Sequence, residues 1–442
     1  MKRLSIYIIL LFAITTTISV FSTEILMAQQ ENKANSGSFY SGIGFGIPVD
    51  HTSPFTMGMG LSGISNYNAI STNISNPAQW GLIGFTQGSV SASLNNFQAT
   101  DFNSSSQNAI FGIEHFQFIF PVIKNRMGIS ASITPMVRGD YRQRNGSSFN
   151  PLPGQGSSVV YDFTSVGSGG ISRFETGFGF SLIDQISLGY AFSANILSMN
   201  TTVSPSFSQS QFRAVNFERK KEGYGFGHRF GIYTYIRNLL NDDDQLSFGA
   251  SVTLPMEIDA DQQVTAFRLV NNQRTLVDYN INSPTRNGNV KLPLEFNTGL
   301  TYNLSRFVNF DAELLIQNWN DALYTFDPVQ QGYFKDRVRT GFGVQYHPYR
   351  SEQIGGFLSR IKYSMGVTYD TGHLEINDQD VETVSLNAGI GLMSIRSASS
   401  VDLSIHYGIR GTESANLVKE NIWGFKISLN LAEMMFVRQR FQ

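Results

Sequence analysis

Residues 292–304 read LPLEFNTGLTYNL, with mostly apolar or aromatic side chains at the even positions and polar residues, proline or glycine at the odd ones. The pattern resumes over 308–317, VNFDAELLIQ, after a short turn at 305–306, and again over 337–346, RVRTGFGVQY. A period of two residues gives each strand one apolar face and one polar face. This part of the chain therefore predicts a series of neighbouring β-strands.

Two architectures share this period. The strands of a soluble β-sandwich also alternate, but they usually have only about five to six residues. The strands here run for roughly ten to fifteen residues, and their polar face carries glycine and ionised side chains, which is typical of a membrane-spanning barrel. The sequence therefore predicts an all-β fold, a transmembrane antiparallel β-barrel.

The composition excludes several classes of protein. The 442 residues include 41 Gly, 35 Phe and 18 Tyr but no Cys, and charged residues make up 15%, whereas about a quarter is usual in soluble proteins. A net charge of −2 argues against a nucleic-acid partner. Without cysteine there is no disulfide framework or thiolate metal site, and the six histidines lack the spacing of metal ligands. We expect no metal and no cofactor.

The first residues resemble an export signal. Lys2 and Arg3 precede an apolar run over 4–20, and the small residue Ala28 ends a plausible cleavage site. The alternative is a membrane-anchoring helix, but threonines at 15–17 dilute the run. We therefore expect residues 1–28 to be a signal peptide. The mature barrel would lie in the outer membrane of a Gram-negative cell, in contact with lipid and lipopolysaccharide.

Alternation along the chain indicates about fourteen strands, an even number that returns both ends to one side of the membrane. They fall near 82–96, 109–121, 127–141, 170–183, 185–201, 222–237, 244–258, 290–305, 307–319, 333–347, 360–372, 381–394, 399–411 and 421–437. Longer loops rich in Gly, Pro, Ser and Asn are expected near 142–169, 202–221, 259–289 and 320–332.

The inward positions carry charges of both signs, which favours a cross-linked and partly filled lumen over a strongly ion-selective pore. The candidate lumen residues are Arg229, Glu295, Asp311, Glu313, Arg337, Arg339 and Arg410. The alternative is that these charged positions form the solvent-exposed outer face of a soluble β-sandwich.

Residues 29–80 do not alternate and are rich in glycine. A barrel of this size has an interior that something must fill if it is not a wide channel. We therefore expect 29–80 to be a hatch inside the barrel that residues 81–442 form. Gly58, Gly60 and Gly63 match the dinucleotide-binding fingerprint, but no βαβ unit surrounds them and no acidic residue follows at the required distance. These glycines instead favour close packing of the hatch against the wall.

Three stretches carry a resemblance to a known family. They are Gly58–Gly63 with the spacer 64–75 and Asn76-Pro77-Ala78, the segment GSGGISRFETGFG at 167–179, and residues 292–319 followed by 335–346. In these the chain resembles the outer-membrane long-chain fatty acid and aromatic-hydrocarbon transporters (FadL/TodX type). The resemblance implies a monomeric barrel of fourteen strands, a hatch that includes Gly58, Gly60, Gly63, Asn76, Pro77 and Ala78, and no enzymatic activity. The spacer lacks the acidic residues usual in that family.

The third expected strand contains Pro135, which cannot donate a ladder hydrogen bond and so belongs at an edge, bulge or gap. The family's lateral opening is associated with a kink in its third strand, so the resemblance implies a lateral gate at Pro135 and Gly139. The alternative is a proline tolerated near a strand end.

The leading functional hypothesis is passive transport of hydrophobic small molecules, either long-chain fatty acids or aromatic hydrocarbons, with lateral exit into the bilayer. The alternative is a hatch-bearing barrel that serves as a shuttle or assembly component of a type 9 secretion system and binds a secretion-system protein. An outer-membrane enzyme such as a lipase is a third possibility, but no Ser/His/Asp set can be assembled, so no catalytic residue is assigned.

Overall fold

The computed structural model describes residues 36–102, 104–149, 159–209, 212–271, 273–277, 285–348, 357–394, 399–414 and 417–433. The expected signal peptide lies outside these residues. Within them, no helix is both long enough and apolar enough to cross a membrane.

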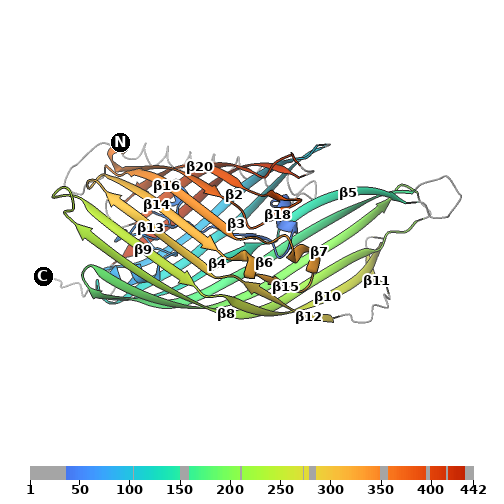
Figure 1. Cartoon of the computed structure of the whole chain (residues 1–442), viewed down its shortest axis with the longest axis horizontal. Helices are drawn as coiled ribbons and strands as arrows, with labels where there is room; N and C mark the ends of the chain where they lie inside the picture. The colour runs from blue at the N-terminus through green and yellow to red at the C-terminus, as the bar shows by residue number, and fades with distance from the viewer. Residues whose placement is uncertain are drawn as a thin grey trace, which may run out of the picture.

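Fourteen antiparallel barrel strands form one closed barrel (Figure 1). We call each of them a stave, because three of the fourteen consist of two consecutive β-strands. Pairing of β22 with β2, from Thr86↔Glu433 to Thr100↔Lys419, closes the ring. In order around the barrel the staves are β2 (Thr86–Thr100), β3 (Ser105–Ile123), β4 (Met127–Arg138) continued by β5 (Tyr141–Phe149), β6 (Val159–Ile183), β7 (Ile186–Phe207), β8 (Asn216–Arg237), β9 (Gln245–Thr253) continued by β10 (Met256–Val270), β12 (Thr285–Leu292) continued by β13 (Glu295–Asn303), β14 (Val308–Gln317), β16 (Arg337–Tyr346), β17 (Ile361–Asp370), β20 (Thr383–Met393), β21 (Ser400–Arg410) and β22 (Lys419–Glu433).

Shorter elements occupy the connections and the lumen. In the connections they are β11 (Gln273–Leu276), η4 (Trp319–Asp321), β15 (Leu323–Tyr324), α2 (Pro328–Gln331), η5 (Phe357–Arg360), β18 (Glu375–Ile376) and β19 (Gln379–Asp380). In the N-terminal segment they are η1 (Phe39–Gly42), β1 (Ile47–Pro48), η2 (Met57–Met59) and η3 (Pro77–Leu82).

The expected all-β barrel is confirmed, and each stave overlaps one of the fourteen expected strands. Side chains alternate as the sequence pattern requires. In β22, for example, Trp423, Phe425, Ile427 and Leu429 are exposed on the outer surface, whereas Ser428 and Asn430 are buried against the interior. Exposed apolar side chains on a barrel fit a surrounding of lipid, where no water is available to solvate polar groups.

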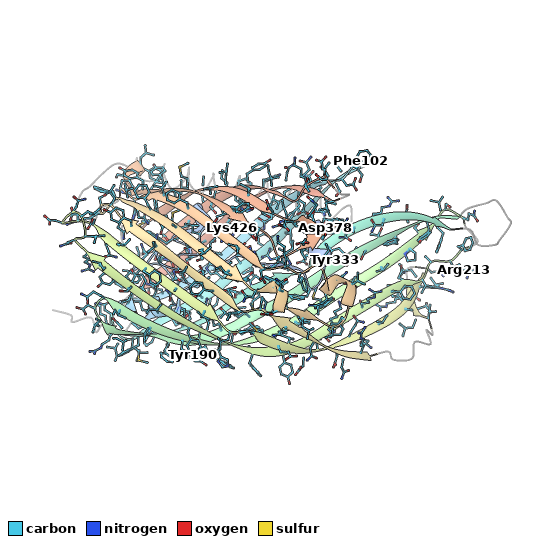
Figure 2. All side chains as sticks on the ribbon, in the orientation of Figure 1. Phe102, Tyr190, Arg213, Tyr333, Asp378 and Lys426 are labelled. Carbon is cyan, nitrogen blue, oxygen red and sulfur yellow. The ribbon has the colours of Figure 1, made fainter. Side chains whose placement is uncertain are left out.

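One side of the barrel is much taller than the other. β6 has 25 residues and β7 and β8 have 22 each, whereas β16 and β17 have 10 each. The outer parts of β6, β7 and β8, together with β5, β10 and β11, form a sheet that projects beyond the other staves; we call it the projecting sheet. Arg213 lies near its far end (Figures 1 and 2). The expected loops at 142–169, 202–221 and 259–289 are therefore wrong in large part, since they contain strand residues. A strand that stands in water on both faces needs no apolar alternation, so the pattern did not mark it.

Residues 36–83 lie inside the barrel, where most of them are buried (Figure 1). Most of this segment is irregular, and it is anchored by short turns with specific caps. Asn76 begins η3, because its side chain accepts a hydrogen bond from the amide of Ala78, and Pro77 supplies the fixed backbone angle that suits a first helical position. We call residues 36–83 the hatch segment.

Candidate functional site

The wall that faces the hatch segment is built from glycine. A Cβ added at Gly189 would lie 2.2 Å from the carbonyl carbon of Pro77, and one at Gly249 would lie 2.0 Å from the carbonyl oxygen of Ile64. Contacts below 3.0 Å with hatch-segment atoms also arise at Gly128, Gly179, Gly231, Gly299, Gly341, Gly343, Gly366 and Gly389. The two backbones thus meet directly around much of the ring, which leaves little room for a passage between them.

The three hatch glycines lie at this contact. A Cβ on Gly58 would meet Gly389 at 2.8 Å, and Gly60 has φ +71 and faces the amide of Asn387. Gly63 has φ +82 and donates its amide hydrogen to the Glu313 carboxylate. Positive φ values and close backbone approach are the two situations in which glycine has no substitute.

Asn76, Pro77 and Ala78 contact the opposite side of the wall. The Asn76 side-chain amide donates to the carbonyl of Ile64 within the hatch segment (2.9 Å) and to the carbonyl of Ile232 in β8 (3.0 Å). Pro77 and Ala78 pack onto Gly189. The motif therefore ends the hatch segment and fastens it to β7 and β8 before the chain enters β2.

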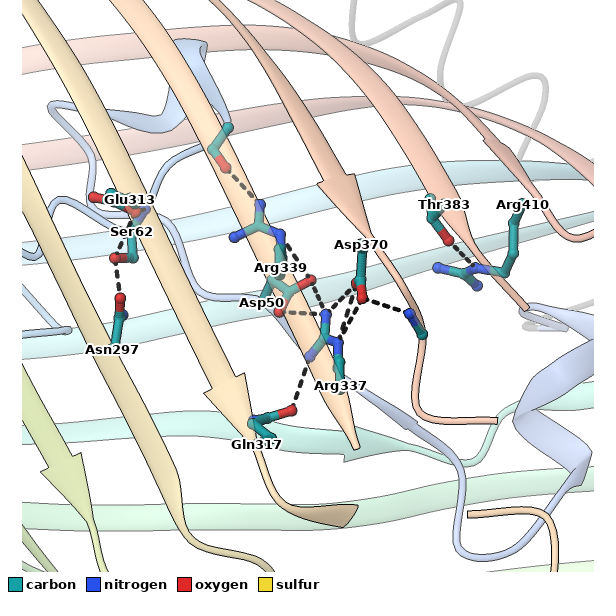
Figure 3. A network of polar contacts seen from close by, with 12 residues as sticks. Asp50, Ser62, Asn297, Glu313, Gln317, Arg337, Arg339, Asp370, Thr383 and Arg410 are labelled. Atoms are coloured by element: carbon teal, nitrogen blue, oxygen red, sulfur yellow. Dashed lines mark hydrogen bonds and ion pairs between the residues drawn. The ribbon is translucent and has the colours of Figure 1, made fainter. Parts of the chain in front are cut away.

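Glu313 and Asp311, both on β14, hold the middle of the hatch segment. The Glu313 carboxylate accepts hydrogen bonds from the amides of Ser62 (2.7 Å), Gly63 (2.7 Å) and Ile64 (3.0 Å), and from the Ser62 hydroxyl (2.9 Å) (Figure 3). Asp311 accepts from the side-chain amide of Asn66 (2.9 Å). A carboxyl group offers several acceptor positions, so one side chain can hold several donors of the segment at once.

A second anchor is centred on Arg337 of β16. Its guanidinium donates to Asp50 of the hatch segment (2.7 Å) and to Asp370 of β17, while neighbouring Arg339 donates to the carbonyl of Gly60 (2.7 Å) (Figure 3). Burial would raise the pKa of Asp50, but Arg337 and Arg339 outweigh it and hold that pKa well below its usual value. Asp50 is therefore ionised at neutral pH.

The remaining lumen candidates are Arg229, Arg410 and Glu295. Arg229 donates to the carbonyls of Ile74 (2.6 Å) and Ser75 (3.0 Å) and pairs with Glu175. Arg410 donates to the Ser38 hydroxyl (3.2 Å). Glu295 differs from the other six because it accepts from Gln317 (2.6 Å) and Thr253, both in the wall. Six of the seven candidates thus contact the hatch segment directly.

Asp50 and Glu175 belong to this network, and Arg173 is buried beside Glu175 on β6, although the sequence pattern does not select any of the three. Arg173 and Glu175 share the inward parity of β6, so alternation extended into 167–179 is the signal that could have identified them. Asp50 lies in the hatch segment, where no periodicity applies.

The wall is incompletely paired beside Pro135. Among the described residues, register partners between β3 and β4 stop at Phe116↔Ile133, and the register of β4 with β6 shifts between Pro135 and Val137. After Pro135, at Val137 and Arg138, β4 pairs instead with β1 of the hatch segment, through Ile47↔Arg138 and Pro48↔Val137. We call this break the seam.

Side chains and backbone atoms bridge the seam. Arg138 donates to the carbonyl of Ile113 (3.3 Å) and pairs with Glu114 (3.2 Å), both on β3. Gly139 follows β4 and donates its amide hydrogen to the carbonyl of Gly169 (2.8 Å). Pro135 thus lies at the seam, while Gly139 lies where the wall turns from β4 into β5.

A cavity of about 90 Å³ lies immediately behind the seam; we call it the chamber. Pro48, Val49, Met136 and Val137 form its seam side. Its other apolar residues are Ile74, Met256, Leu292, Pro293, Leu315 and Trp319, and its charged residues are Asp50, Arg173, Glu175, Arg229, Glu295, Glu313 and Arg339. The chamber therefore has both an apolar and a charged part.

Solved structures of two toluene transporters and of a FadL homologue share this architecture. The Ralstonia pickettii toluene transporter TbuX superposes with a TM-score of 0.54 at 13% identity, over 87% of this chain and 98% of that one. The P. putida toluene transporter TodX gives 0.54 at 11%, over 88% and 99%. A Pseudomonas aeruginosa FadL homologue gives 0.55 at 11%, also over 88% and 99%. The expected FadL/TodX-type barrel fold is thus confirmed.

The family itself carries a different name. The model of the BamG family matches residues 10–442, nearly the whole sequence, and this chain belongs to the BamG family. No curated protein matches it.

Proposed function

We propose that this barrel passively transports small hydrophobic molecules across the outer membrane of a Gram-negative cell and releases them sideways through the seam. One observation carries the proposal: the chamber lies directly behind the place where β3 and β4 stop pairing. A solute in the chamber is separated from the bilayer by residues 47–49 of the hatch segment and by the side chain of Arg138.

No energy source is required. A solute that leaves water for the bilayer gains about 0.8 kcal/mol for each buried CH₂ group, so partitioning drives net movement without a cofactor. The toluene transporters with the same fold support this substrate class. The chamber volume of about 90 Å³ is smaller than the cavity of about 150 Å³ that holds a benzene ring, so toluene must widen the chamber as it passes. A long acyl chain would require the chamber to widen considerably.

The test is uptake by vesicles with lipopolysaccharide in the outer leaflet. Vesicles that contain the purified barrel should accumulate radiolabelled toluene faster than protein-free vesicles, and a hydrophilic sugar should enter both at the same rate. Equal toluene rates in the two preparations would refute transport. Faster entry of the sugar as well would indicate an open pore in place of a selective route.

A second candidate is a secretion or assembly component, and the projecting sheet favours it. Transport through the seam gives no role to the outer parts of β6, β7 and β8, and membership of the BamG family does not by itself bring transport to this chain. Copurification from native membranes of a stoichiometric partner that is lost when the projecting sheet is shortened would support this function. Recovery of the barrel alone would count against it.

A further inference from the structure

Among the described cations that line the chamber, Arg173 has the most unused hydrogen-bonding capacity: two of its nitrogens have no acceptor, against one, Nε, for Arg229. Arg173 of β6 is only 6% exposed, and its Nε and one terminal nitrogen, Nη2, have no acceptor among the described residues. A buried donor without a partner costs free energy, so such groups are normally paired. Arg173 faces Thr134 across the β4–β6 register, next to Pro135, which places it beside the seam.

The carboxylates around the chamber are already engaged elsewhere. Glu313 accepts four hydrogen bonds from the hatch segment, Asp50 is paired with Arg337, and Glu175 is paired with Arg229. Glu295 accepts from Gln317. Nδ1 of His51, which also lines the chamber, is without a partner too, so it does not accept from Arg173. The unused donors of Arg173 therefore point to an acceptor that the described residues do not supply.

The charges of the lining decide the kind of acceptor. Four carboxylates, those of Asp50, Glu175, Glu295 and Glu313, line the chamber against three guanidinium groups. Burial lowers the pKa of His51, which also lines it, to about 4, so this ring is neutral at neutral pH. An added anion would meet net negative charge in a poorly solvated space, where repulsion is weakly screened. A neutral oxygen can accept from Arg173 without that cost.

We propose that the chamber selects small, neutral, oxygenated hydrocarbons, with a carbonyl or ether oxygen on Arg173 and the carbon body against Met136, Met256, Leu292 and Trp319. This inference rests on the proposed transport function and narrows its substrate class. It predicts preference for a ketone over both the bare hydrocarbon and the carboxylate of similar size. The chamber volume of about 90 Å³ favours the smallest members of this class; butanone, which is about as large as benzene, fits once the chamber widens toward the roughly 150 Å³ of a cavity that holds benzene.

The test is binding to the full-length barrel in detergent, measured by saturation-transfer NMR with butanone, n-butane and butyrate. Wild-type protein should bind butanone saturably and the other two at least about tenfold more weakly. Equal binding of butane would show that Arg173 contributes nothing, and tightest binding of butyrate would show an anion site. Binding of none of the three would mean that water alone satisfies Arg173. Each of these three outcomes overturns the inference.

Two variants test whether Arg173 causes the preference for the ketone. Arg173→Gln should abolish the preference for butanone over butane. Arg144→Gln, the same substitution at an exposed residue of β5 paired with Asp162, should leave it unchanged. The ligand series on wild-type protein decides the inference even if Arg173→Gln fails to fold. The inference and the transport function can fail separately: ketone binding without toluene uptake refutes transport, and uptake without ketone preference refutes the selectivity.

Discussion

Glu313 shows how one side chain can fix a long irregular segment. Its carboxylate accepts from three consecutive amides of the hatch segment, and no neutral side chain of similar size offers as many acceptor positions. In Glu313→Gln, the new NH₂ group would face amide donors, leaving at least one of them unpaired. We expect a loss of about 3 kcal/mol in the free energy of unfolding, measured by urea titration in detergent with Trp80 of η3 as the fluorescent reporter.

Glu222→Gln is the matched control for that experiment, because within the described part of the chain Glu222 pairs with Lys220 alone and both side chains are largely exposed. It should unfold at the wild-type urea concentration. If the Glu313 and Glu222 variants unfold at the same midpoint, the hatch segment does not depend on the Glu313 carboxylate.

Glycines of the wall make a second residue-scale prediction. Gly189→Ala would place a methyl group 2.2 Å from the backbone of Pro77, which cannot move aside as a flexible side chain could. We expect overpacking to cost about 1–3 kcal/mol in unfolding free energy. Gly88→Ala in β2, where the nearest atom is 3.8 Å away, should cost little. Similar urea midpoints for the two variants would show that the hatch segment yields easily.

Alternation in the sequence identified the inward position of six lumen candidates that contact the hatch segment, because parity along a strand is a local property. It could not identify their partners. Glu313 meets Ser62 across 251 residues of chain, and nothing in the local pattern of either segment encodes that pairing. Arg173 was missed for a different reason: it lies inside the expected strand 170–183, but Ile171 and Gly177 share its parity, so that face of the strand does not read as polar.

At the scale of elements, the seam joins three pieces of chain, β3, β4 and β1. The pair Pro48↔Val137 places two Cα atoms in strand register, within the range that a disulfide spans. The chain has no native cysteine, so Pro48→Cys with Val137→Cys would form one defined crosslink. Because residues 47–49 close the seam, we expect oxidation to reduce toluene uptake to the protein-free rate, and reduction to restore it.

The control crosslink lies in a part of the wall that is fully paired. Thr298→Cys with Leu314→Cys joins β13 to β14 at another register pair, away from the seam. Its oxidation should leave uptake unchanged. Uptake that persists after complete oxidation of the seam pair would place the exit elsewhere in the molecule.

The proline in the third stave shows what element-level prediction can reach. Since proline removes a ladder donor, a break in pairing near Pro135 follows from chemistry alone. The pairing of β1 with β4 beyond the break could not be predicted in this way, because a strand of two residues is too short to show a period. The projecting sheet was missed for the opposite reason: it is long, but water on both faces removes the alternation by which a strand in lipid is recognised.

At the scale of the molecule, the hatch segment determines whether the barrel is a channel at all. Barrels with eight strands are filled by their own side chains, and those with sixteen or more enclose water. A barrel of fourteen staves lies near the second case, yet here residues 36–83 contact the inner wall through glycines and buried charges. We therefore expect the wild-type protein to pass almost no current in a planar lipid bilayer.

Deletion of residues 36–80 should convert this closed barrel into a conducting one. Carboxylates and guanidinium groups now held by the hatch segment, such as Glu313 and Arg229, would face water, which solvates them at little cost, and the β22–β2 closure would be unaffected. Stable current steps from the deletion variant, absent from wild type, would confirm that the hatch segment closes the lumen. Equal conductance of the two proteins would mean that wild-type barrels already open by displacing it, and release through the wall would then be unnecessary.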